Sequence, residues 1–224
     1  MNIFPNNLFS VIEHLIEKGY YFNTVYDVGA NKGLWTKKML GILPSANFVL
    51  FEANNIHKKP KELDSRHNWF NVVLSSPAKS IVMFYNIQGT GDSYFKENTT
   101  HYKNITPVEM KTETLDNIIE NHNLLIPNLI KLDTQGAELD ILEGAKKILQ
   151  DTDIITLEAP IMSYNQGAPC LDEYLTFLLD YNFYPIGLEG IQFSNGFLVQ
   201  LDLVFVKKNI KDRYWGNNGK GFGA

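Results

Sequence analysis

The sequence predicts an α/β protein: a doubly wound, mostly parallel seven-stranded sheet with an antiparallel C-terminal hairpin and a small inserted strand pair. Strand-like apolar runs alternate with segments of helical periodicity through most of the chain, which is typical of a parallel sheet with helices on both faces. The first such run breaks into a glycine turn that leads into a helix-like segment. Near the C-terminus, two long strand-like runs are separated only by Ser194-Asn195-Gly196, which indicates a hairpin at the edge of the sheet.

The chain opens with a segment that we expect to be an amphipathic helix. Asn6 or Asn7 is a suitable N-cap for it, and Gly19 is a suitable end. Its apolar stripe has helical spacing and consists of Leu8, Val11, Ile12, Leu15 and Ile16.

The remaining elements follow from the same two periodicities. We expect strands at 24–29, 47–52, 69–75, 80–87, 107–112, 128–133, 153–158, 183–192 and 198–207. We expect helices at 32–41, 56–65, 114–121, 138–149 and 171–181. The helix at 138–149 is the best defined, because it begins with acids and ends with lysines, as the helix dipole favours. Gly144 in its middle costs about 1 kcal/mol relative to alanine, so we expect a close helix–sheet contact there.

The first strand-like run leads into the most informative motif of the chain. Residues 25–33 read Val-Tyr-Asp-Val-Gly-Ala-Asn-Lys-Gly, so a strand that carries Asp27 turns through Gly29 and Gly33 into a helix-like segment. Such turns form nucleotide-type cofactor sites in α/β folds, since glycine lets a ligand approach the backbone closely. Nineteen residues after Gly33, a second run ends in Glu52. That is about the spacing at which an acid binds ribose hydroxyls.

This pattern favours S-adenosylmethionine (SAM) over a dinucleotide. The dinucleotide fingerprint requires Gly-x-Gly-x-x-Gly, and its second and third glycine positions are Asn31 and Leu34 here. An acid at the strand end suits a ligand with an ammonium group and a cationic sulfur. We therefore expect Asp27 to face the methionine part of SAM, with the amides of Gly29, Ala30 and Asn31 beneath it. The alternative reading is an ordinary strand–helix turn with a chance glycine pair.

Three segments make the chain similar to the FkbM family of SAM-dependent methyltransferases. They are Asp27-Val28-Gly29-Ala30-Asn31-Lys32-Gly33, Phe51-Glu52-Ala53-Asn54, and a block from Ile130 to Ala145 that contains Asp133-Thr134-Gln135-Gly136-Ala137-Glu138. The third is the most specific, because the family typically carries a strand, Asp-x-x-Gly-x-Glu and a helix with Gly-Ala at this place. The similarity spans roughly residues 24–160. The inserted strand pair, with Gly89-Thr90-Gly91-Asp92-Ser93 between its strands, also resembles the family.

The resemblance implies the Rossmann-like fold of class I methyltransferases, with SAM as cofactor and S-adenosylhomocysteine (SAH) as its product. It implies an O-methyltransferase that acts on a hydroxyl of a carbohydrate or small metabolite. Two other functions remain open. One is a SAM- or nucleoside-binding protein without transferase activity, and the other is a nucleotide-sugar or NAD(P)-linked enzyme on the same fold.

The strand ends provide the rest of the candidate adenosyl site, because ligands of doubly wound sheets lie beyond the carboxyl ends of the strands. We expect Glu52 to bind the ribose hydroxyls through charge-assisted hydrogen bonds, with Ala53 beside it. We expect Leu74 and Ser75 to flank the adenine.

Two further carboxylates are candidates for the general base that removes the proton of the acceptor hydroxyl. Asp133 and Glu158 each end a predicted strand and point to where methyl group and acceptor meet. For Asp133, we prefer a cofactor-binding role in which it orients the SAM amino group. No metal ion is expected, because Ala159-Pro160 follows Glu158 where metal-dependent O-methyltransferases carry an Asp-Asn pair.

Length and composition set the remaining expectations. At 224 residues we expect a single methyltransferase domain, with an N-terminal helix in 1–20, a cofactor-binding core in 24–160 and a flexible tail in 210–224. A net charge of −5 argues against a nucleic-acid partner. The single cysteine suits a reducing compartment. Because no apolar run is long enough to span a bilayer, we expect a cytoplasmic protein without a membrane span.

Overall fold

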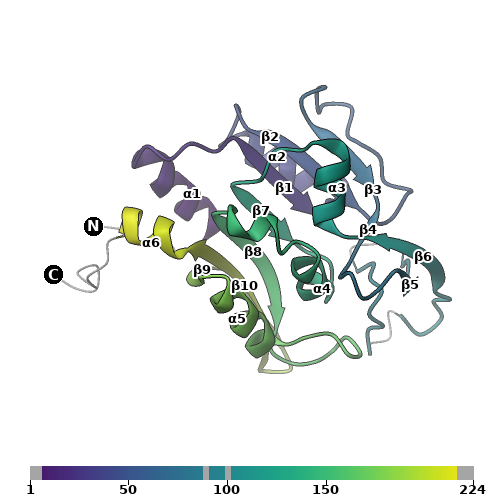
Figure 1. Ribbon diagram of the computed structural model, residues 1–224. Helices are drawn as coiled ribbons and strands as arrows, with labels where there is room; N and C mark the ends of the chain where they lie inside the picture. The colour runs from purple at the N-terminus through teal and green to yellow at the C-terminus, as the bar shows by residue number, and fades with distance from the viewer. Residues whose placement is uncertain (1–6, 88–90, 99–101, 216–224) are drawn as a thin grey trace.

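The computed structural model describes residues 7–87, 91–98 and 102–215, which form a seven-stranded sheet between two layers of helices (Figure 1). The strand order is β3-β2-β1-β7-β8-β10-β9. The bounds are β1 Thr24–Val28, β2 Asn47–Glu52, β3 Asn68–Asn71, β7 Leu129–Leu132, β8 Ile154–Pro160, β9 Phe183–Ser194 and β10 Phe197–Lys207.

The strand directions confirm the expected fold class. Strands β3, β2, β1, β7 and β8 are parallel, whereas β10 pairs antiparallel with both β8 and β9. A second sheet of three strands contains β4 (Val73–Leu74), β5 (Ile81–Phe84) and β6 (Val108–Glu113). Because β5 and β6 pair antiparallel, they are the predicted inserted strand pair.

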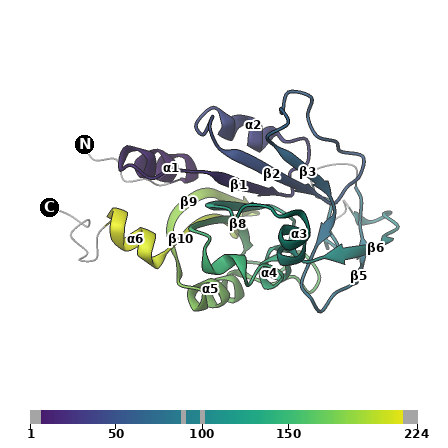
Figure 2. The ribbon, with the colours of Figure 1, turned by 45° about the horizontal axis from the view of Figure 1, so that its top comes forward.

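Helices cover both faces of the main sheet (Figure 2). In that view, α1 (Leu8–Glu17) and α2 (Leu34–Leu40) lie above the sheet, and α3 (Leu115–His122), α4 (Glu138–Glu143) and α5 (Leu171–Asp180) lie below it. Each layer encloses its own core. On β1, Val25 packs into the core on the α1 side, and its neighbour Tyr26 packs into the core on the α4 side. In the part of the chain that the structure describes, no helix is long and apolar enough to cross a membrane.

The first helix forms where the apolar stripe predicts it. Asn7 is the N-cap, and its Oδ1 accepts a hydrogen bond from the amide of Ser10 at 2.9 Å. Such a cap contributes about 1 kcal/mol. Leu8, Val11, Ile12 and Leu15 of the stripe are fully buried. Most other elements agree with their predicted bounds to within three residues.

The prediction of a helix at 56–65 is wrong, because these residues form turns and irregular backbone. Pro60 lies in the middle of the segment and has no amide to donate within a helix. Within 56–65 only Leu63 is buried, so the segment has no apolar face to pack.

The run predicted as one strand at 69–75 is divided between the two sheets. β3 pairs with β2 and ends at Asn71, whereas β4 begins at Val73 and pairs with β6. The amide of Val72 donates to the carbonyl of Glu52 at 3.0 Å, which marks the point where the chain leaves the main sheet. Because of this division, the small sheet lies beside the end of β2.

The predicted helix at 138–149 is also too long. α4 ends at Glu143, and the chain continues to the short 3₁₀ helix η2 (Ile148–Gln150). A Cβ at Gly144 would lie 2.3 Å from the carbonyl oxygen of Ser75 and 3.2 Å from the Cβ of Thr114. The close contact that we expected here therefore exists, but the residues beyond β4 and before α3 provide it rather than the main sheet.

The predicted flexible tail at 210–224 needs correction in its first part. Residues Lys208–Trp215 form α6, in which Ile210 is buried. The rings of Trp215 and His14 are 5.0 Å apart, so α6 packs against α1. Residues 216–224 lie outside the described residues.

The close packing of Gly29 leads to a first testable expectation. Its φ is +76°, and a Cβ there would lie 1.9 Å from the carbonyl oxygen of Asp133. Gly19 has a similar φ of +84° with nothing within 4 Å. We expect Gly19→Ala to lower the free energy of unfolding by about 1–2 kcal/mol, the cost of the left-handed conformation alone. Gly29→Ala should lose about 3 kcal/mol or more in urea titrations, and equal losses at both positions would contradict the contact.

Candidate active site

A cavity of about 370 Å³ lies at the carboxyl ends of β1, β2 and β7, where doubly wound sheets bind ligands. We call it the larger cavity. Seven of the ten predicted cofactor-binding residues line it, namely Gly29, Ala30, Asn31, Glu52, Ala53, Leu74 and Asp133. Apolar side chains complete much of its wall, among them Phe51, Val73, Phe84 and Ile141.

The bend between β1 and α2 forms one side of the larger cavity. The amides of Gly29 and Ala30 both donate to the carbonyl of Phe51, each at 3.0 Å. The amide of Asn31 donates to Oε2 of Glu52 at 2.6 Å. All three amides thus have partners within the protein, so the bend provides a smooth backbone surface rather than three free donors.

Glu52 ends β2 and is largely buried at the wall of the larger cavity. Its Oε1 accepts a hydrogen bond from the amide of Asn54 at 2.8 Å. Burial raises the pKa of Glu52, and the amides of Asn54 and Asn31 together with the imidazole of His57 act against this rise. Each carboxylate oxygen has a second lone pair, so Glu52 is able to accept further hydrogen bonds from hydroxyl groups.

Three predicted cofactor-binding residues do not line the larger cavity. Asp27 is fully buried beneath it, where its Oδ2 accepts a hydrogen bond from Thr36 Oγ1 at 2.7 Å. Gly33 caps α2, and a Cβ there would lie 2.9 Å from Pro60. Ser75 is buried, with its hydroxyl 3.2 Å from that of Tyr94. The structure thus places these three residues outside the lining of the larger cavity, in contact with other parts of the protein.

Sequence reasoning missed Lys131, the buried cation at the centre of this site. Its Nζ lies 3.2 Å from Oδ1 of Asp27, 3.3 Å from Oδ2 of Asp133 and 3.1 Å from the carbonyl oxygen of Gly29. Burial acts to lower the pKa of Lys131, but the two carboxylates outweigh burial and hold the pKa above its usual value. The available signal was a single lysine inside the apolar run of β7.

A smaller cavity of about 130 Å³ adjoins the larger one, and Trp35, Lys131 and Asp133 line both. The rest of the smaller cavity includes Thr156 and Glu158 of β8, Glu189 of β9 and Asp202 of β10. Glu158 lies two residues before the end of β8 rather than at the predicted strand end. Within the described ranges, no lysine or arginine forms an ion pair with Glu158, Glu189 or Asp202.

The crowding of acids in the smaller cavity changes their proton affinity. Burial together with the charges of Asp133, Glu138 and Asp202 raises the pKa of Glu158 well above its usual range. Burial and the charge of Asp202 likewise raise the pKa of Glu189. Glu158 is therefore a carboxyl that binds a proton more strongly than a solvent-exposed glutamate.

The turn after β7 is fixed by Glu138, which is fully buried. Its Oε1 accepts hydrogen bonds from the amide and hydroxyl of Thr134, at 2.7 and 3.0 Å. Its Oε2 accepts from the amide of Gly136 and the hydroxyl of Tyr174, each at 3.0 Å. Four donors on one buried carboxylate hold Gln135, between Thr134 and Gly136, in a fixed position.

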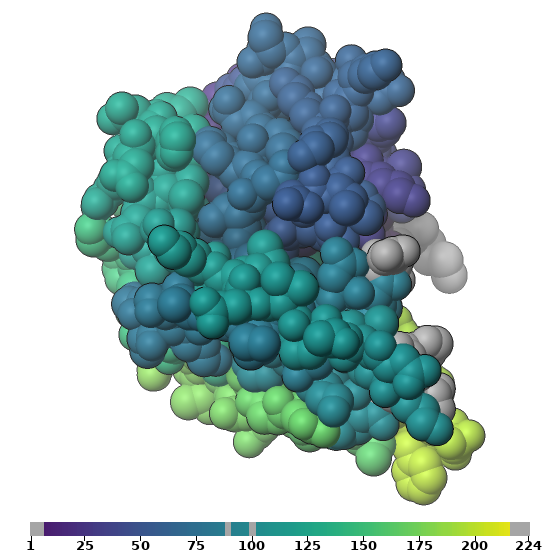
Figure 3. Space-filling model, turned by 90° about the vertical axis from the view of Figure 1, so that its right-hand side faces the viewer, coloured from purple at the N-terminus to yellow at the C-terminus, as the bar shows by residue number. Residues whose placement is uncertain are grey.

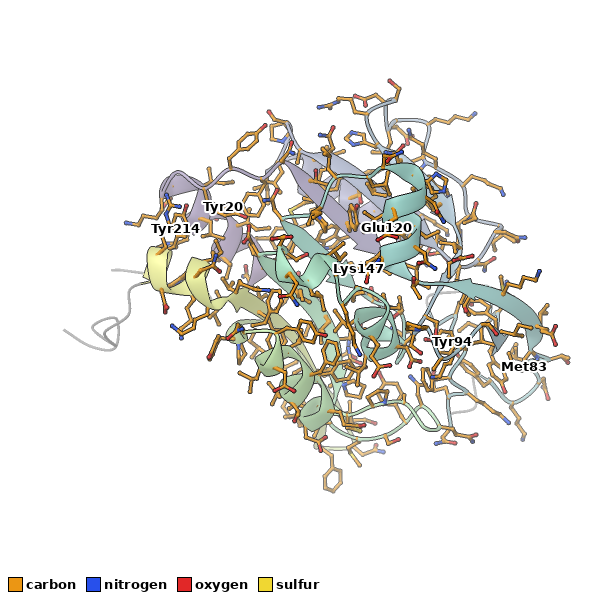
Figure 4. All side chains as sticks on the ribbon, viewed as in Figure 1. Tyr20, Met83, Tyr94, Glu120, Lys147 and Tyr214 are labelled. Carbon is orange, nitrogen blue, oxygen red and sulfur yellow. The ribbon has the colours of Figure 1, made fainter. Side chains whose placement is uncertain are left out.

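The connection between β5 and β6, which we call the inserted segment, closes the larger cavity on another side. Asp92, Ser93 and Tyr94 all line it. Asp92 Oδ2 accepts a hydrogen bond from Asn54 Nδ2 at 2.6 Å, and the Tyr94 hydroxyl donates to Asp140 at 2.9 Å. Figure 4 shows Tyr94 between α4 and the small sheet. Figure 3 shows the side of the molecule that lies to the right in Figure 1, and the inserted segment forms the middle of that side.

The arrangement combines two chemical capabilities. The larger cavity offers an apolar slot and a buried carboxylate with unused lone pairs, which suits a ligand with a flat ring and hydroxyl groups. The smaller cavity offers carboxyl groups that bind protons strongly. In the described parts of the chain, no group of three or more His, Cys, Asp or Glu side chains is arranged to hold a metal ion.

Comparisons with known sequences agree with the family resemblance. A sequence model of the methyltransferase FkbM domain matches residues 16–184, which is well over half of the chain. The 2-O-methyltransferase NoeI of Sinorhizobium fredii (strain NBRC 101917 / NGR234) is 26% identical over 187 residues. That alignment covers 74% of this chain and 76% of the relative.

A comparison with solved structures agrees with the fold. The crystal structure of methyltransferase FkbM from Methylobacillus flagellatus KT matches 82% of this chain with a TM-score of 0.50 and 14% identity. The match covers 43% of the length of that protein's chain. The chain therefore belongs to the methyltransferase FkbM domain family, and it is a SAM-dependent methyltransferase with a class I Rossmann-like fold.

Proposed function

We propose that the larger cavity binds SAM and that the enzyme methylates a hydroxyl of a carbohydrate or small metabolite bound in the smaller cavity. The observation that carries this proposal is that the two cavities meet at Trp35, Lys131 and Asp133. Methyl transfer requires the acceptor oxygen, the methyl carbon and the sulfur to lie in line. Two cavities with a common wall provide room for that arrangement.

The residues of the larger cavity fit the adenosyl part of SAM. Leu74, Val73 and Ile141 supply apolar surface for the adenine. The carboxylate of Glu52 is fixed by two amides and is able to accept from the ribose hydroxyls.

The other end of the larger cavity fits the methionine part. The side chain of Asp133 is 41% exposed, and Lys131 holds its Oδ2. When bound, SAM supplies a methyl group made electrophilic by its cationic sulfur. Asp133 provides negative charge at this end, which attracts the ammonium and sulfonium groups of the ligand.

The lining of the smaller cavity supports a hydroxyl-rich acceptor. The indole of Trp35 offers an apolar face, and Glu158, Glu189 and Asp202 offer several hydrogen-bond acceptors. A sugar-like ring presents apolar C–H faces together with hydroxyl donors, so both kinds of lining have a partner. The 26% identity to a 2-O-methyltransferase also supports an oxygen acceptor.

Glu158 is the proposed base. Gln135 Nε2 donates to both Asp133 and Glu158, but Asp133 also forms an ion pair with Lys131, whereas Glu158 forms no ion pair within the described residues. Its raised pKa makes the ionised carboxylate a strong proton acceptor. The hydroxyl of the acceptor gives its proton to Glu158 as its oxygen takes the methyl group.

A first experiment tests the acceptor class. With methyl-labelled SAM, we expect label on neutral methyl glycosides and much less on a methyl uronide, whose carboxylate meets the acids of the smaller cavity. Asp202→Asn should narrow this difference, whereas Glu62→Gln at an exposed position should not. If the wild-type enzyme binds SAH but labels no hydroxyl compound, the acceptor half of the proposal is wrong.

A second experiment tests the adenosyl site. We expect Glu52→Gln to weaken SAH binding about tenfold or more in calorimetry, since a hydrogen bond to a charged group contributes about 1.5–3 kcal/mol. Glu62→Gln is the matched control, because it removes a carboxylate with 69% side-chain exposure. If Glu52→Gln binds SAH as tightly as the wild type, Glu52 does not bind the ribose hydroxyls.

A third experiment tests Glu158 through two opposite effects. Because its pKa is raised on folding, the unfolded chain loses this proton at lower pH than the folded protein, so the group reduces stability as pH rises above about 4.3. We therefore expect Glu158→Gln to raise the melting temperature more at pH 8 than at pH 4.5. The same variant should lower kcat about 100-fold. A variant that loses stability at pH 8, or that keeps full kcat, contradicts the assignment.

A further inference from the structure

We propose that Gln135 is a positioning residue that holds Glu158 in place to receive the proton of the acceptor. This inference rests on the proposed function, because it concerns the same base. Gln135 lines the larger cavity, whereas Glu158 lines the smaller one. The side chain of Gln135 therefore reaches from the larger cavity to a residue of the smaller one.

The contacts of the Gln135 amide carry the proposal. Its Nε2 lies 2.9 Å from Oε2 of Glu158 and 3.2 Å from Oδ1 of Asp133. One amide nitrogen has two hydrogens, so it is able to donate to both carboxyls at once. A neutral double donor between two acids keeps them at a fixed separation and reduces their repulsion.

The backbone of Gln135 is held in an uncommon conformation. Its φ is +56°, in the left-handed region that residues other than glycine adopt at a cost of about 1–2 kcal/mol. Its carbonyl oxygen accepts hydrogen bonds from Ser93 Oγ and from Asn165 Nδ2, both at 2.9 Å. The inserted segment and the connection between β8 and α5 thus both fix this one residue. Strain maintained by several independent contacts is typical of functional positions.

The amide of Gln135 suits this position better than a carboxylate or an apolar side chain, because it donates to both neighbouring carboxyls. A carboxylate at position 135 would add a third negative charge beside Asp133 and Glu158. An apolar side chain would leave both carboxyls without this donor. Since a hydrogen bond to the charged form favours ionisation, losing it should raise the pKa of Glu158 further.

The test uses two variants of position 135 and one control in the full chain. Gln135→Met keeps the length of the side chain without the amide. Gln135→Gly removes the amide and also the backbone strain, so it does not risk misfolding through the left-handed conformation. Gln166→Met is the control, because Gln166 Nε2 donates to Asn98 Oδ1 at 2.7 Å at an exposed site of the connection between β8 and α5.

Three measurements separate a positioning role from a purely structural one. We expect SAH affinity within about threefold of wild type in all variants, and kcat with a neutral methyl glycoside about tenfold lower or more at pH 7 in both position-135 variants. In carboxyl-¹³C spectra of glutamate-labelled protein, assigned with Glu158→Gln, the midpoint of Glu158 should rise by about one pH unit. The control should match wild type throughout.

The outcomes are distinct. An unchanged Glu158 midpoint or an unchanged kcat in the position-135 variants overturns the role of Gln135. If the wild-type enzyme methylates no glycoside, the proposed function fails, and the titration of Glu158 still decides whether Gln135 controls this carboxyl. A loss of SAH binding in Gln135→Gly would show that the residue serves the cofactor rather than the base.

Discussion

The carboxyl edge of the sheet depends on one buried ammonium group. Lys131 lies in β7 and contacts Asp27 of β1, the carbonyl of Gly29 in the bend and Asp133 beyond its own strand. The cluster joins two segments, residues 27–29 and 131–133, that the sequence separates by about a hundred residues. Removing the cation would leave Asp27 fully buried without its partner, a change that typically costs 3–5 kcal/mol. Two members of this cluster, Lys131 and Asp133, form part of the wall that the two cavities share.

The same cluster determines the electrostatics of the site. Two carboxylates face one ammonium, so one negative charge remains uncompensated beside the larger cavity. A cationic sulfonium is favoured in such surroundings, whereas the thioether that remains after methyl transfer is neutral at sulfur. If SAM binds as proposed, the attraction at this end weakens when the reaction is complete. The proposed arrangement therefore favours release of the product over retention.

Much of the fold could be predicted from the sequence, because apolar periodicity and helix caps are local signals. The bend at Gly29 and the carboxylate of Glu52 were predicted on the same basis, since each follows an apolar run. Asp27 was expected to face the methionine part of SAM, and the structure places it fully buried beneath the larger cavity, in contact with Lys131 and Thr36. Local periodicity does not specify these partners, because they come from other segments. Lys131 was missed because a lysine is rarely fully buried inside a strand unless acid partners from elsewhere in the fold pair with it.

The acids of the hairpin show a further limit of sequence reasoning. Asp202 stands opposite Glu158 because β10 pairs antiparallel with β8 in one particular register. A shift of one residue would turn Asp202 to the other face of the sheet. Apolar alternation predicts that the hairpin exists, but it does not specify which residue of β8 lies beside which residue of β10. The smaller cavity is therefore a product of tertiary pairing.

The inserted segment explains why the wall of the larger cavity is formed in advance of ligand binding. The chain leaves the main sheet at Val72, and β4 then pairs with β6. This segment is connected to the core at separate points, since Asp92 accepts a hydrogen bond from Asn54 and Ser93 donates to the carbonyl of Gln135. Each contact joins the insertion to a different strand end, one after β2 and the other after β7. A wall fixed at both strand ends loses little conformational entropy when a ligand binds, which strengthens binding without additional contacts.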